Sequence, residues 1–360
     1  MRLQRVRERM AALDVDALLL SLGADLPWLT GYEAMPLERL TMLVLPRDDD
    51  ATLVVPALEA PRVREDPARF RVRPWQETED PVAIVARLVG GRRSLAVSDR
   101  TWARFVLALQ ASLPQATWQP ASLVTGPLRA VKDAEEVAAL RRAAQAADRV
   151  ARRLQAGDIP LIGRTEAEVS ADISDRLRAE GHDRVNFAIV ASGPNAASPH
   201  HEPGPRRIGA GESVVCDFGG SLDGYCSDVT RTVFTGPAPS EFRDLYAVLH
   251  AAQAAAVEAA VVGTPCEDVD AVARRIIEDG GYGPYFVHRT DHGIGVEEHE
   301  DPYLVAGNCE PLVAGHVFSV EPGIYLPGRW GARIEDIVVA TEPGPEPLNT
   351  VPHELIEVES

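Results

Sequence analysis

The stretch that decides the fold is residues 213–234, SVVCDFGGSLDGYCSDVTRTVF. Two runs of residues typical of β-strands flank Ser221 to Gly224, a composition typical of a hairpin turn. Because side chains alternate between the two faces of a strand, Asp217 and Asp228 share one face of this hairpin, either directly opposed or one pair apart. The turn composition leaves both registers open.

Two carboxylates on one face of a hairpin repel each other, and in the direct register their Cβ atoms lie about 4.5–5.5 Å apart. Burying both is costly unless protons or a cation neutralise them. A metal ion is the natural neutraliser. The competing explanation is a solvated hairpin whose acidic residues merely align, and the hairpin alone does not choose between the two.

Three further stretches combine His, Glu and Asp with glycines in apolar surroundings: HRTDHGIGVEEHEDP (288–302), SVEPGIY (319–325) and ARIEDIVV (332–339). Single histidines are usually structural, but His292 belongs to a group of three within twelve positions and is followed by a glycine. Glu321 and Glu335 each lie in an otherwise apolar strand, where an unpaired carboxylate is expensive. For Glu335, a plain salt bridge with Arg333 on the same strand face is the competing explanation.

Counting these candidates gives four carboxylates and one imidazole: Asp217, Asp228, Glu321, Glu335 and His292. An oxygen-rich set with one nitrogen donor and no thiolate suits Mn²⁺ or Co²⁺ better than a structural cysteine-type zinc site. Several bridging carboxylates suggest two ions that share a water, which then serves as the nucleophile. The sequence has no HExxH, GxSxG or GxxxxGK[ST] motif, and no GxGxxG after a strand.

Composition excludes several classes of protein. The chain has 54 acidic and 36 basic residues, a formal net charge of −18, so we expect no nucleic acid partner. There is no run of 18 apolar residues, so we expect no membrane association. The four cysteines include no CxxC pair, which fits a reducing compartment and predicts a cytoplasmic protein.

The one lysine, Lys132, precedes an acidic helix start. A lysine that forms a cofactor Schiff base sits in a desolvated pocket, whereas this position has the character of a charged linker. We therefore expect no such cofactor.

The 360 residues predict two domains. In the first, strand-like runs at 16–21, 40–46, 51–56 and 94–99 alternate with amphipathic stretches such as 81–90, which indicates an α/β layer. Residues 121–133 have the composition of a linker. Capping boxes at Asp133/Glu136, Thr165/Glu168 and Thr264/Glu267 predict helices over 133–156, 165–180 and 265–279, with a further helix over 240–261. Strand-like runs lie between and after them, at 186–193, 213–220, 225–234, 317–325 and 334–340.

The ordered motifs DFGGSLDGYCSDVTRT, HGIGVEEHEDP, SVEPGIY and RIED resemble the pita-bread metallopeptidase superfamily, which includes methionine aminopeptidase, aminopeptidase P, prolidase and the metal-free creatinase. SGPNAASPHH (192–201) and the long N-terminal domain resemble the proline-specific branch. The resemblance implies an α/β (α+β) protein: a small creatinase/prolidase-like α/β domain over residues 1–125, then a pita-bread catalytic domain over residues 130–360.

The resemblance also implies a site with two divalent ions, commonly manganese, with cobalt or zinc as alternatives. The implied metal ligands are Asp217, Asp228, His292, Glu321 and Glu335. Asp228 and Glu335 would bridge the ions, Asp217 would complete the first ion, and His292 with Glu321 would complete the second.

Further catalytic and substrate-binding roles follow from the same resemblance. Glu321 is the implied proton shuttle, and His299 and His200 would contact the substrate and the tetrahedral intermediate. His288 and Tyr325 are similar to the proline-pocket residues of aminopeptidase P. One departure is Asp291, since many relatives have glycine before the metal-binding histidine; this carboxylate could either alter the surroundings of the metal or point to solvent.

We therefore expect an Xaa-Pro dipeptidase (prolidase) that hydrolyses the bond before proline in a small peptide, with a metal-activated hydroxide as nucleophile. The alternative is an Xaa-Pro aminopeptidase that releases the N-terminal residue of longer peptides. A dipeptidase needs a cation for the proline carboxylate, and the sequence does not single out one arginine. A catalytically inert binding module, or a metal-free creatinase, would lack the ligands. A homodimer is implied by the resemblance only.

Overall fold

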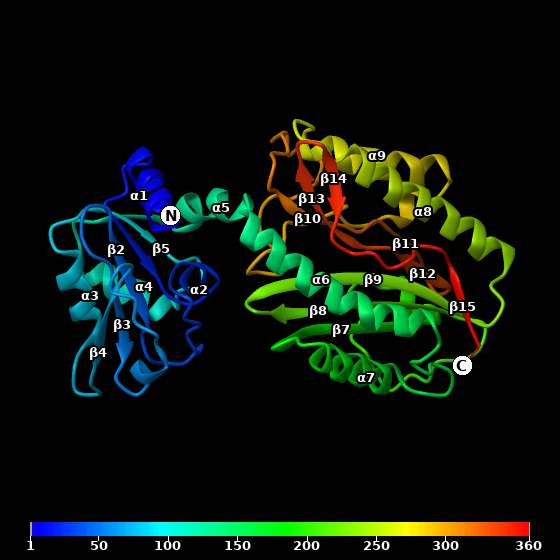
Figure 1. Cartoon of the computed structure of the whole chain (residues 1–360), viewed down its shortest axis with the longest axis horizontal. Coiled ribbons are helices and arrows are strands. Elements are labelled where there is room, and N and C mark those ends of the chain that lie inside the picture. Colours follow the sequence, from blue (N-terminus) through cyan, green and yellow to red (C-terminus); the bar gives the residue numbers. More distant parts are fainter. Residues whose placement is uncertain (1, 360) are drawn as a thin grey trace. The chain divides into compact units, whose positions relative to one another are not determined.

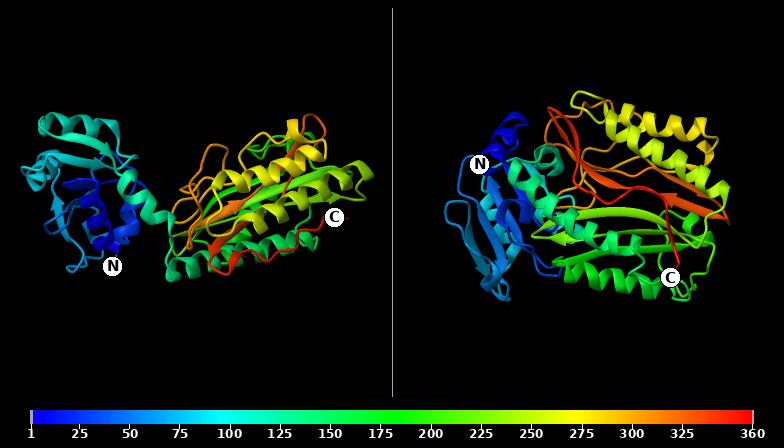
Figure 2. Two further views of the ribbon diagram at one scale, coloured as in Figure 1. Left: turned by 90° about the horizontal axis from the view of Figure 1, so that it is seen from above. Right: turned by 45° about the vertical axis from the view of Figure 1, so that its right-hand side comes forward.

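The computed structural model describes residues 2–359 and divides into two compact units, one up to residue 129 and one from residue 130 on (Figures 1 and 2). The first unit has one sheet, the second has three, and each unit has buried apolar clusters of its own. Among the described residues, no helix is both long enough and apolar enough to cross a membrane.

The first unit is a six-stranded mixed sheet with helices, as expected for an α/β layer. Its strand order is β4-β3-β2-β1-β5-β6, and β1 pairs parallel with β5 and antiparallel with β2. The four predicted strands are confirmed. The strands are β1 (Ala17–Leu20), β2 (Met42–Pro46), β3 (Thr52–Pro56), β4 (Arg71–Trp75), β5 (Ser94–Val97) and β6 (Thr117–Pro120), and the α-helices are α1 (Arg2–Ala12), α2 (Asp25–Thr30), α3 (Pro81–Val89) and α4 (Ala103–Ser112).

The linker predicted over 121–133 is wrong for most of its length. Residues Ser122–Ala130 form a helix, α5, although Pro127 lies inside it. Gly126 and Pro127 are breaker signals in the sequence, but Val124 of this helix is fully buried. Tertiary packing therefore outweighs the local signal, and only three residues separate α5 from the next helix.

Four long helices build the second unit, each within two residues of its predicted ends: α6 (Ala134–Gln155), α7 (Glu166–Ala179), α8 (Ser240–Ala259) and α9 (Cys266–Asp279). The capping boxes at Asp133 and Thr165 are confirmed by reciprocal side-chain hydrogen bonds. The third is wrong: α9 has no side-chain cap. Glu267 instead accepts hydrogen bonds from Gly307 N and Cys309 Sγ, because a distant loop competes for its carboxylate.

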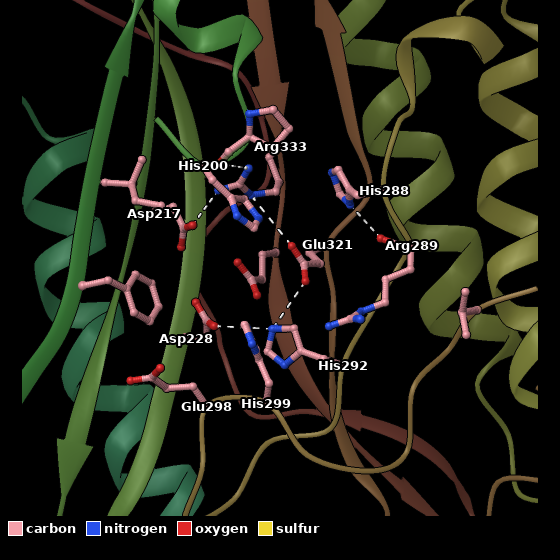
Figure 3. Close-up of a pocket in the computed structure, with 15 residues that line it drawn as sticks. His200, Asp217, Asp228, His288, Arg289, His292, Glu298, His299, Glu321 and Arg333 are labelled. Atoms are coloured by element: carbon pink, nitrogen blue, oxygen red, sulfur yellow. Dashed lines mark hydrogen bonds and ion pairs between the residues drawn. The ribbon is translucent and has the colours of Figure 1, made fainter. Parts of the chain in front are cut away.

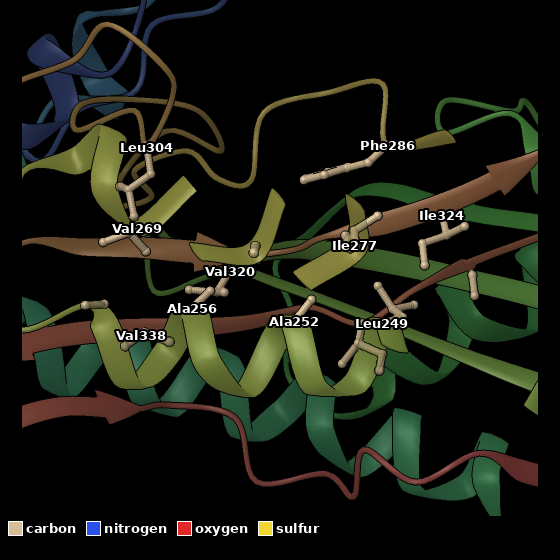
Figure 4. Packing of buried hydrophobic residues seen from close by; sticks show 14 of the residues in the cluster. Leu249, Ala252, Ala256, Val269, Ile277, Phe286, Leu304, Val320, Ile324 and Val338 are labelled. Atoms are coloured by element: carbon tan, nitrogen blue, oxygen red, sulfur yellow. The ribbon is translucent and has the colours of Figure 1, made fainter. Parts of the chain in front are cut away.

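The strands of the second unit lie between two pairs of helices (Figure 1). Apolar residues of α6 and α7 pack against β8 and β9, and those of α8 and α9 pack against β10, β11 and β13 (Figure 4). One sheet has the order β15-β9-β8-β7, a second β10-β13-β14, and β11 pairs with β12. The strands are β7 (Arg184–Ser192), β8 (Ser213–Leu222), β9 (Tyr225–Thr235), β10 (Val317–Val320), β11 (Gly323–Leu326), β12 (Trp330–Arg333), β13 (Asp336–Thr341), β14 (Gly344–Pro347) and β15 (Ile356–Val358).

The predicted strand over 317–325 is split in two at Glu321 and Pro322. Proline has no backbone N–H to donate to a ladder, so the pairing stops there. Glu321 therefore lies in a break between strands, and its backbone N–H donates to Thr290 O at 2.9 Å.

The β8–β9 hairpin has the second of the two registers left open by the sequence. Leu222 pairs with Tyr225, so Asp223 and Gly224 form a two-residue loop. Both have positive φ, 52° and 79°, as a type I′ turn requires. Asp228 pairs with Gly219 rather than with Asp217, which places the two aspartates one pair apart on a common face.

Candidate metal centre

A cavity of about 570 Å³ in the second unit contains the residues singled out by the sequence (Figure 3). All five predicted metal ligands line it, and so do three of the four predicted substrate-binding residues. The lining residues are Phe187, Ile189, Pro199, His200, Asp217, Asp228, His288, Arg289, His292, Glu298, His299, Val305, Glu321, Arg333 and Glu335.

The hairpin supplies the two aspartates. Both are buried, and the Oδ1 atom of each has no hydrogen-bond partner among the described residues. Gly219, opposite Asp228, allows the chains to approach: a Cβ there would lie 2.1 Å from Ser227 O and 2.9 Å from the Phe187 ring. The solvated-hairpin explanation is therefore wrong, and each of the two buried carboxylates has one oxygen, Oδ1, without a donor among the described residues.

His292 is held by a segment that runs beside β10. Ser319 N donates to His292 O at 2.8 Å, and Ile294 N donates to Val317 O at 3.1 Å. A Cβ at Gly293 would lie 2.3 Å from Asp301 O. The residue after His292 must therefore be glycine if this segment is to pack against the Asp301 loop.

The two glutamates come from the ends of strands. Glu321 follows β10 and accepts a hydrogen bond from Ser319 Oγ at 3.2 Å. Glu335 precedes β13 and is tied to β9, since Thr230 Oγ1 donates to Glu335 Oε2 at 2.6 Å and Glu335 N donates to Thr230 O. Separate elements thus direct both carboxylates toward the hairpin.

The ligand atoms of Asp228, His292 and Glu335 all lie within 4.8 Å of one another. His292 Nε2 is 3.7 Å from Asp228 Oδ2 and 3.4 Å from Glu321 Oε1 (Figure 3). These separations suit a cation placed between the side chains, and the donor set of four carboxylates and one imidazole suits a divalent ion.

The pKa shifts of these side chains also favour a bound cation. Burial, followed by the carboxylates of Glu335 and Asp217, raises the pKa of Asp228 well above its usual range. Burial and Glu321 do the same to the pKa of Glu335, and burial raises the pKa of Glu321 to about 7. Burial also lowers the pKa of His292 to about 3. The imidazole is thus neutral, as a ligand must be, and the carboxylates need positive charge to remain ionised together.

The Arg333–Glu335 salt bridge, the competing explanation for Glu335, is not the pairing that the structure shows. Arg333 Nη2 donates to Asp217 Oδ2 at 2.5 Å, and Nη1 donates to the Tyr325 hydroxyl at 2.9 Å. The antiparallel β11–β12 pair brings Tyr325 opposite Gly331, two residues before Arg333. Glu335 is therefore free of the ion pair that offered the competing explanation for it.

The four histidine and tyrosine positions differ in their access to the cavity. His299 stacks edge-on against His292, with ring centroids 4.1 Å apart, and His200 is exposed in the cavity. His288 lines it and lies 2.9 Å from the Tyr325 hydroxyl through Nε2. Tyr325 is buried and does not line the cavity, so it contacts His288 and Arg333 from behind.

Sequence reasoning missed some of the lining. Arg289 lies between His288 and Thr290 in a motif already recognised, and its guanidinium carbon is 4.5 Å from the centre of the Tyr303 ring. Among the described residues it forms no ion pair. Phe187, Ile189 and Val305 add apolar surface; their strand and loop positions carry no pattern that would have marked them.

The structure decides between the two alternatives for Asp291. Its side chain is fully buried, and neither carboxylate oxygen has a hydrogen-bond partner among the described residues. It therefore does not point to solvent. Burial, with Glu321 and Glu335 nearby, raises the pKa of Asp291 well above its usual range.

The sequence context of Lys132 predicts a solvated, charged linker, and this prediction is wrong. Its side chain is 1% exposed, and Nζ lies 2.7 Å from Glu300 Oε1. The neighbour of Glu300 in the chain, His299, lines the cavity. The lysine is thus buried and lies against a carboxylate.

Comparisons with known proteins agree with this geometry. Residues 138–342 match the model of metallopeptidase family M24, and residues 2–131 match that of the Creatinase/Prolidase N-terminal domain. The chain is 45% identical to a probable dipeptidase PepE of Mycobacterium tuberculosis over 357 residues, which cover 97% of this chain and 94% of that one.

Solved structures give the same result. Dipeptidase PepE from Mycobacterium ulcerans superposes with a TM-score of 0.92 at 45% identity, over 100% of this chain and 97% of that one. A recombinant prolidase from Thermococcus sibiricus superposes with a TM-score of 0.94 at 37% identity, over 99% and 98%. The pita-bread fold expected from the motifs is confirmed. With a buried carboxylate and histidine cluster in its cavity and a Creatinase/Prolidase N-terminal domain ahead of it, this chain is a metallopeptidase of family M24.

Proposed function

We propose that this protein is an Xaa-Pro dipeptidase, which hydrolyses the bond before proline in dipeptides. The observation that carries the proposal is the convergence of four carboxylates and one imidazole on a single cavity, with the Oδ1 atoms of Asp217 and Asp228 left without partners. The relatives named dipeptidase and prolidase support the substrate class. An Xaa-Pro aminopeptidase acting on longer peptides is the second candidate.

Five residues would hold the metal: Asp217, Asp228, His292, Glu321 and Glu335. When bound, two divalent ions supply Lewis-acid polarisation of the scissile carbonyl and acidify a water molecule. We propose manganese as the native ion, with cobalt or zinc as alternatives, since all of these accept oxygen and nitrogen ligands.

Glu321 is the proposed carrier of the proton. Its Oε1 atom accepts from Ser319 Oγ, and its Oε2 atom lies 4.0 Å from Arg333 Nε, beyond hydrogen-bond distance. Oε2 is therefore the proposed atom that takes a proton from the attacking water and delivers it to the leaving nitrogen. Without a metal its pKa is raised to about 7 by burial.

His299 and His200 are the proposed contacts to the substrate. Each has a ring in the cavity, and burial lowers the pKa of His299. A neutral imidazole can donate one hydrogen bond to a carbonyl oxygen as negative charge develops on it. We assign His288 to the wall of the proline site, because the proline ring needs no donor for its nitrogen. The buried Tyr325 hydroxyl contacts His288 from behind and would fix its orientation.

A dipeptidase also needs a cation for the carboxylate of proline. Two guanidinium groups line the cavity, and Arg333 is already paired with Asp217. Arg289 has no acidic partner among the described residues, so we propose it as the cation that receives this carboxylate. A cytoplasmic location and a homodimer remain part of the proposal, the latter on the resemblance alone.

The test compares Ala-Pro, Ala-Pro amide and Ala-Pro-Ala at one Mn²⁺ concentration, with and without a chelator. Binding energy of the proline carboxylate orients the scissile bond. We therefore expect the amide and the tripeptide to have kcat/KM values lower by about tenfold or more than Ala-Pro. Efficient cleavage of either one would overturn the dipeptidase proposal in favour of the aminopeptidase.

A further inference from the structure

Glu166, the first residue of α7, is a glutamate turned inward. Its side chain is 0% exposed, whereas Glu168 in the same turn is exposed and caps the helix. An exposed carboxylate already complements the partial positive charge at the start of a helix. Burying a second one is unfavourable unless several donors meet it, so the role of Glu166 lies in what it binds.

All the hydrogen bonds that its carboxylate accepts come from residues 192–204, which run from the last residue of β7 through a short 3-10 helix (Gly193–Ala197) and are called the 192–204 loop. Oε1 accepts from Ser192 N at 2.9 Å and from Ser192 Oγ at 2.8 Å. Asn195 Nδ2 lies 3.0 Å from Oε1 and 3.2 Å from Oε2. His201 Nε2 donates to Oε2 at 2.8 Å, and Gly204 N lies 3.4 Å from the same atom. One carboxylate thus contacts the start, middle and end of the loop.

These donors keep the carboxyl ionised. Burial raises the pKa of Glu166, but the hydrogen bonds from His201, Ser192 and Asn195 together lower it below its usual value. A carboxylate that accepts several bonds also fixes their directions, since each donor must point at one of two oxygens. The contact is therefore one that specifies the loop conformation.

The loop carries His200 into the cavity (Figure 3). No hydrogen bond of the His200 ring is present among the described residues, so the backbone on either side decides where the ring points. On one side Pro199 O accepts from Arg333 Nη1 at 3.3 Å. On the other side the next residue, His201, is bound to Glu166.

We propose that Glu166 is a positioning residue for catalysis: it holds the 192–204 loop so that His200 faces the substrate. The inference rests on the proposed function only for the role that it gives to His200. A structural role confined to anchoring α7 is the competing explanation. The two differ in whether the effect of Glu166 on turnover depends on His200.

A double-mutant cycle separates them, with metal content measured for each variant. Glu166→Gln keeps the shape of the side chain but replaces an acceptor oxygen by an amide donor. We expect it to lower kcat/KM for Ala-Pro by about tenfold to a hundredfold, because small misplacements of a contacting group are that costly. In a His200→Ala background the same change should lower kcat/KM by no more than about twofold, since the His200 contact that Glu166 supports is already absent.

The matched control is Glu168→Gln, which removes a charge from the same helical turn without contacting the loop. This variant should retain wild-type turnover.

Hydrogen exchange of the amides supplies a readout that needs no activity. Glu166→Gln should speed exchange within residues 192–204 by at least about tenfold, while Glu168→Gln leaves this loop unchanged. If Glu166→Gln fails to fold, Asn195→Ala removes a donor from the loop side and takes its place in both measurements.

Each outcome decides one proposal. Equal losses with and without His200, or unchanged exchange in the loop, would overturn the positioning role. If the wild-type protein with Mn²⁺ hydrolyses none of the three peptides, the proposed function fails instead, and the exchange data alone decide the role of Glu166.

Discussion

Arg333 and Asp217 are joined across two sheets by a hydrogen-bonded ion pair of 2.5 Å, with the Arg333 side chain 3% exposed. The same guanidinium group donates to Thr230, Tyr325 and the backbone of Pro199. One cation therefore contacts the proposed ligand Asp217, Thr230, which donates to the proposed ligand Glu335, and the loop that carries His200. Breaking a buried pair leaves an uncompensated charge and costs more than an exposed pair.

Replacing this cation should disturb both metal and catalysis. We expect Arg333→Gln to lower kcat/KM by at least about tenfold and to raise the Mn²⁺ concentration needed for half-maximal activity, because Asp217 loses its fixed orientation. Arg329→Gln is the matched control, since that arginine lies on the same hairpin and pairs with Glu241 at the surface. An unchanged metal requirement in Arg333→Gln would contradict this prediction.

Asp228→Asn should lower the amount of bound metal. The substitution removes a carboxylate that faces His292 and Glu335, so metal analysis after dialysis against Mn²⁺ should give fewer ions per chain. Thermal unfolding in Mn²⁺ should also begin at a lower temperature, because bound ions stabilise only the folded state. Asp223→Asn, in the turn of the same hairpin, is the control: asparagine also tolerates its φ of 52°. Unchanged stoichiometry in Asp228→Asn would refute the ligand assignment.

Substitution of the two substrate-facing histidines should affect turnover but not metal content, unlike substitution of the metal ligands. We expect His299→Ala and His200→Ala to retain the wild-type metal content while turnover falls by about tenfold or more, since such groups act on the transition state. Metal analysis and kinetics on the same preparations provide the check. Loss of metal from either variant would move that histidine into the ligand set.

Stability should depend on Glu212 in a pH-dependent way. The hydrogen bond from Arg206, opposed by burial, holds the pKa of Glu212 below its usual value of 4.5. A carboxyl with a lowered folded-state pKa stabilises the protein above its unfolded-state pKa, and this contribution disappears as pH falls through the folded-state pKa. Urea unfolding should therefore show Glu212→Gln less stable than wild type at pH 7, with the difference shrinking at lower pH. A difference that stays constant down to acidic pH would exclude this linkage.

Much of the fold was predictable because its signals are local. The period of two placed Asp217 and Asp228 on one face, and the caps at Asp133 and Thr165 marked helix starts correctly. The register of the hairpin was not predictable, because the turn composition allowed two loop positions. The structure shows a loop of Asp223 and Gly224, both with positive φ. Candidate ligands were recognisable because carboxylates in apolar strands are costly without a partner.

What the sequence could not decide depends on which residues, often distant in sequence, a side chain contacts. Arg333 pairs with Asp217, 116 residues away, rather than with its near neighbour Glu335. Glu267 serves a loop near Gly307 instead of its own helix cap. The resemblance assigns Tyr325 to the substrate site, and only the structure shows that its hydroxyl lies against His288 and Arg333 rather than in the cavity. Periodicity cannot report which of several partners a long side chain reaches.

The burial of Lys132 has a practical consequence. It is the chain's one lysine, and its amine lies against Glu300 with 1% of the side chain exposed. Acylating reagents, aldehyde cross-linkers and enzymes that conjugate lysine side chains all need a free, accessible amine. The folded protein offers them no lysine to modify, and reaction at this position would report that the segment carrying His299 and Glu300 has separated from the residues between α5 and α6.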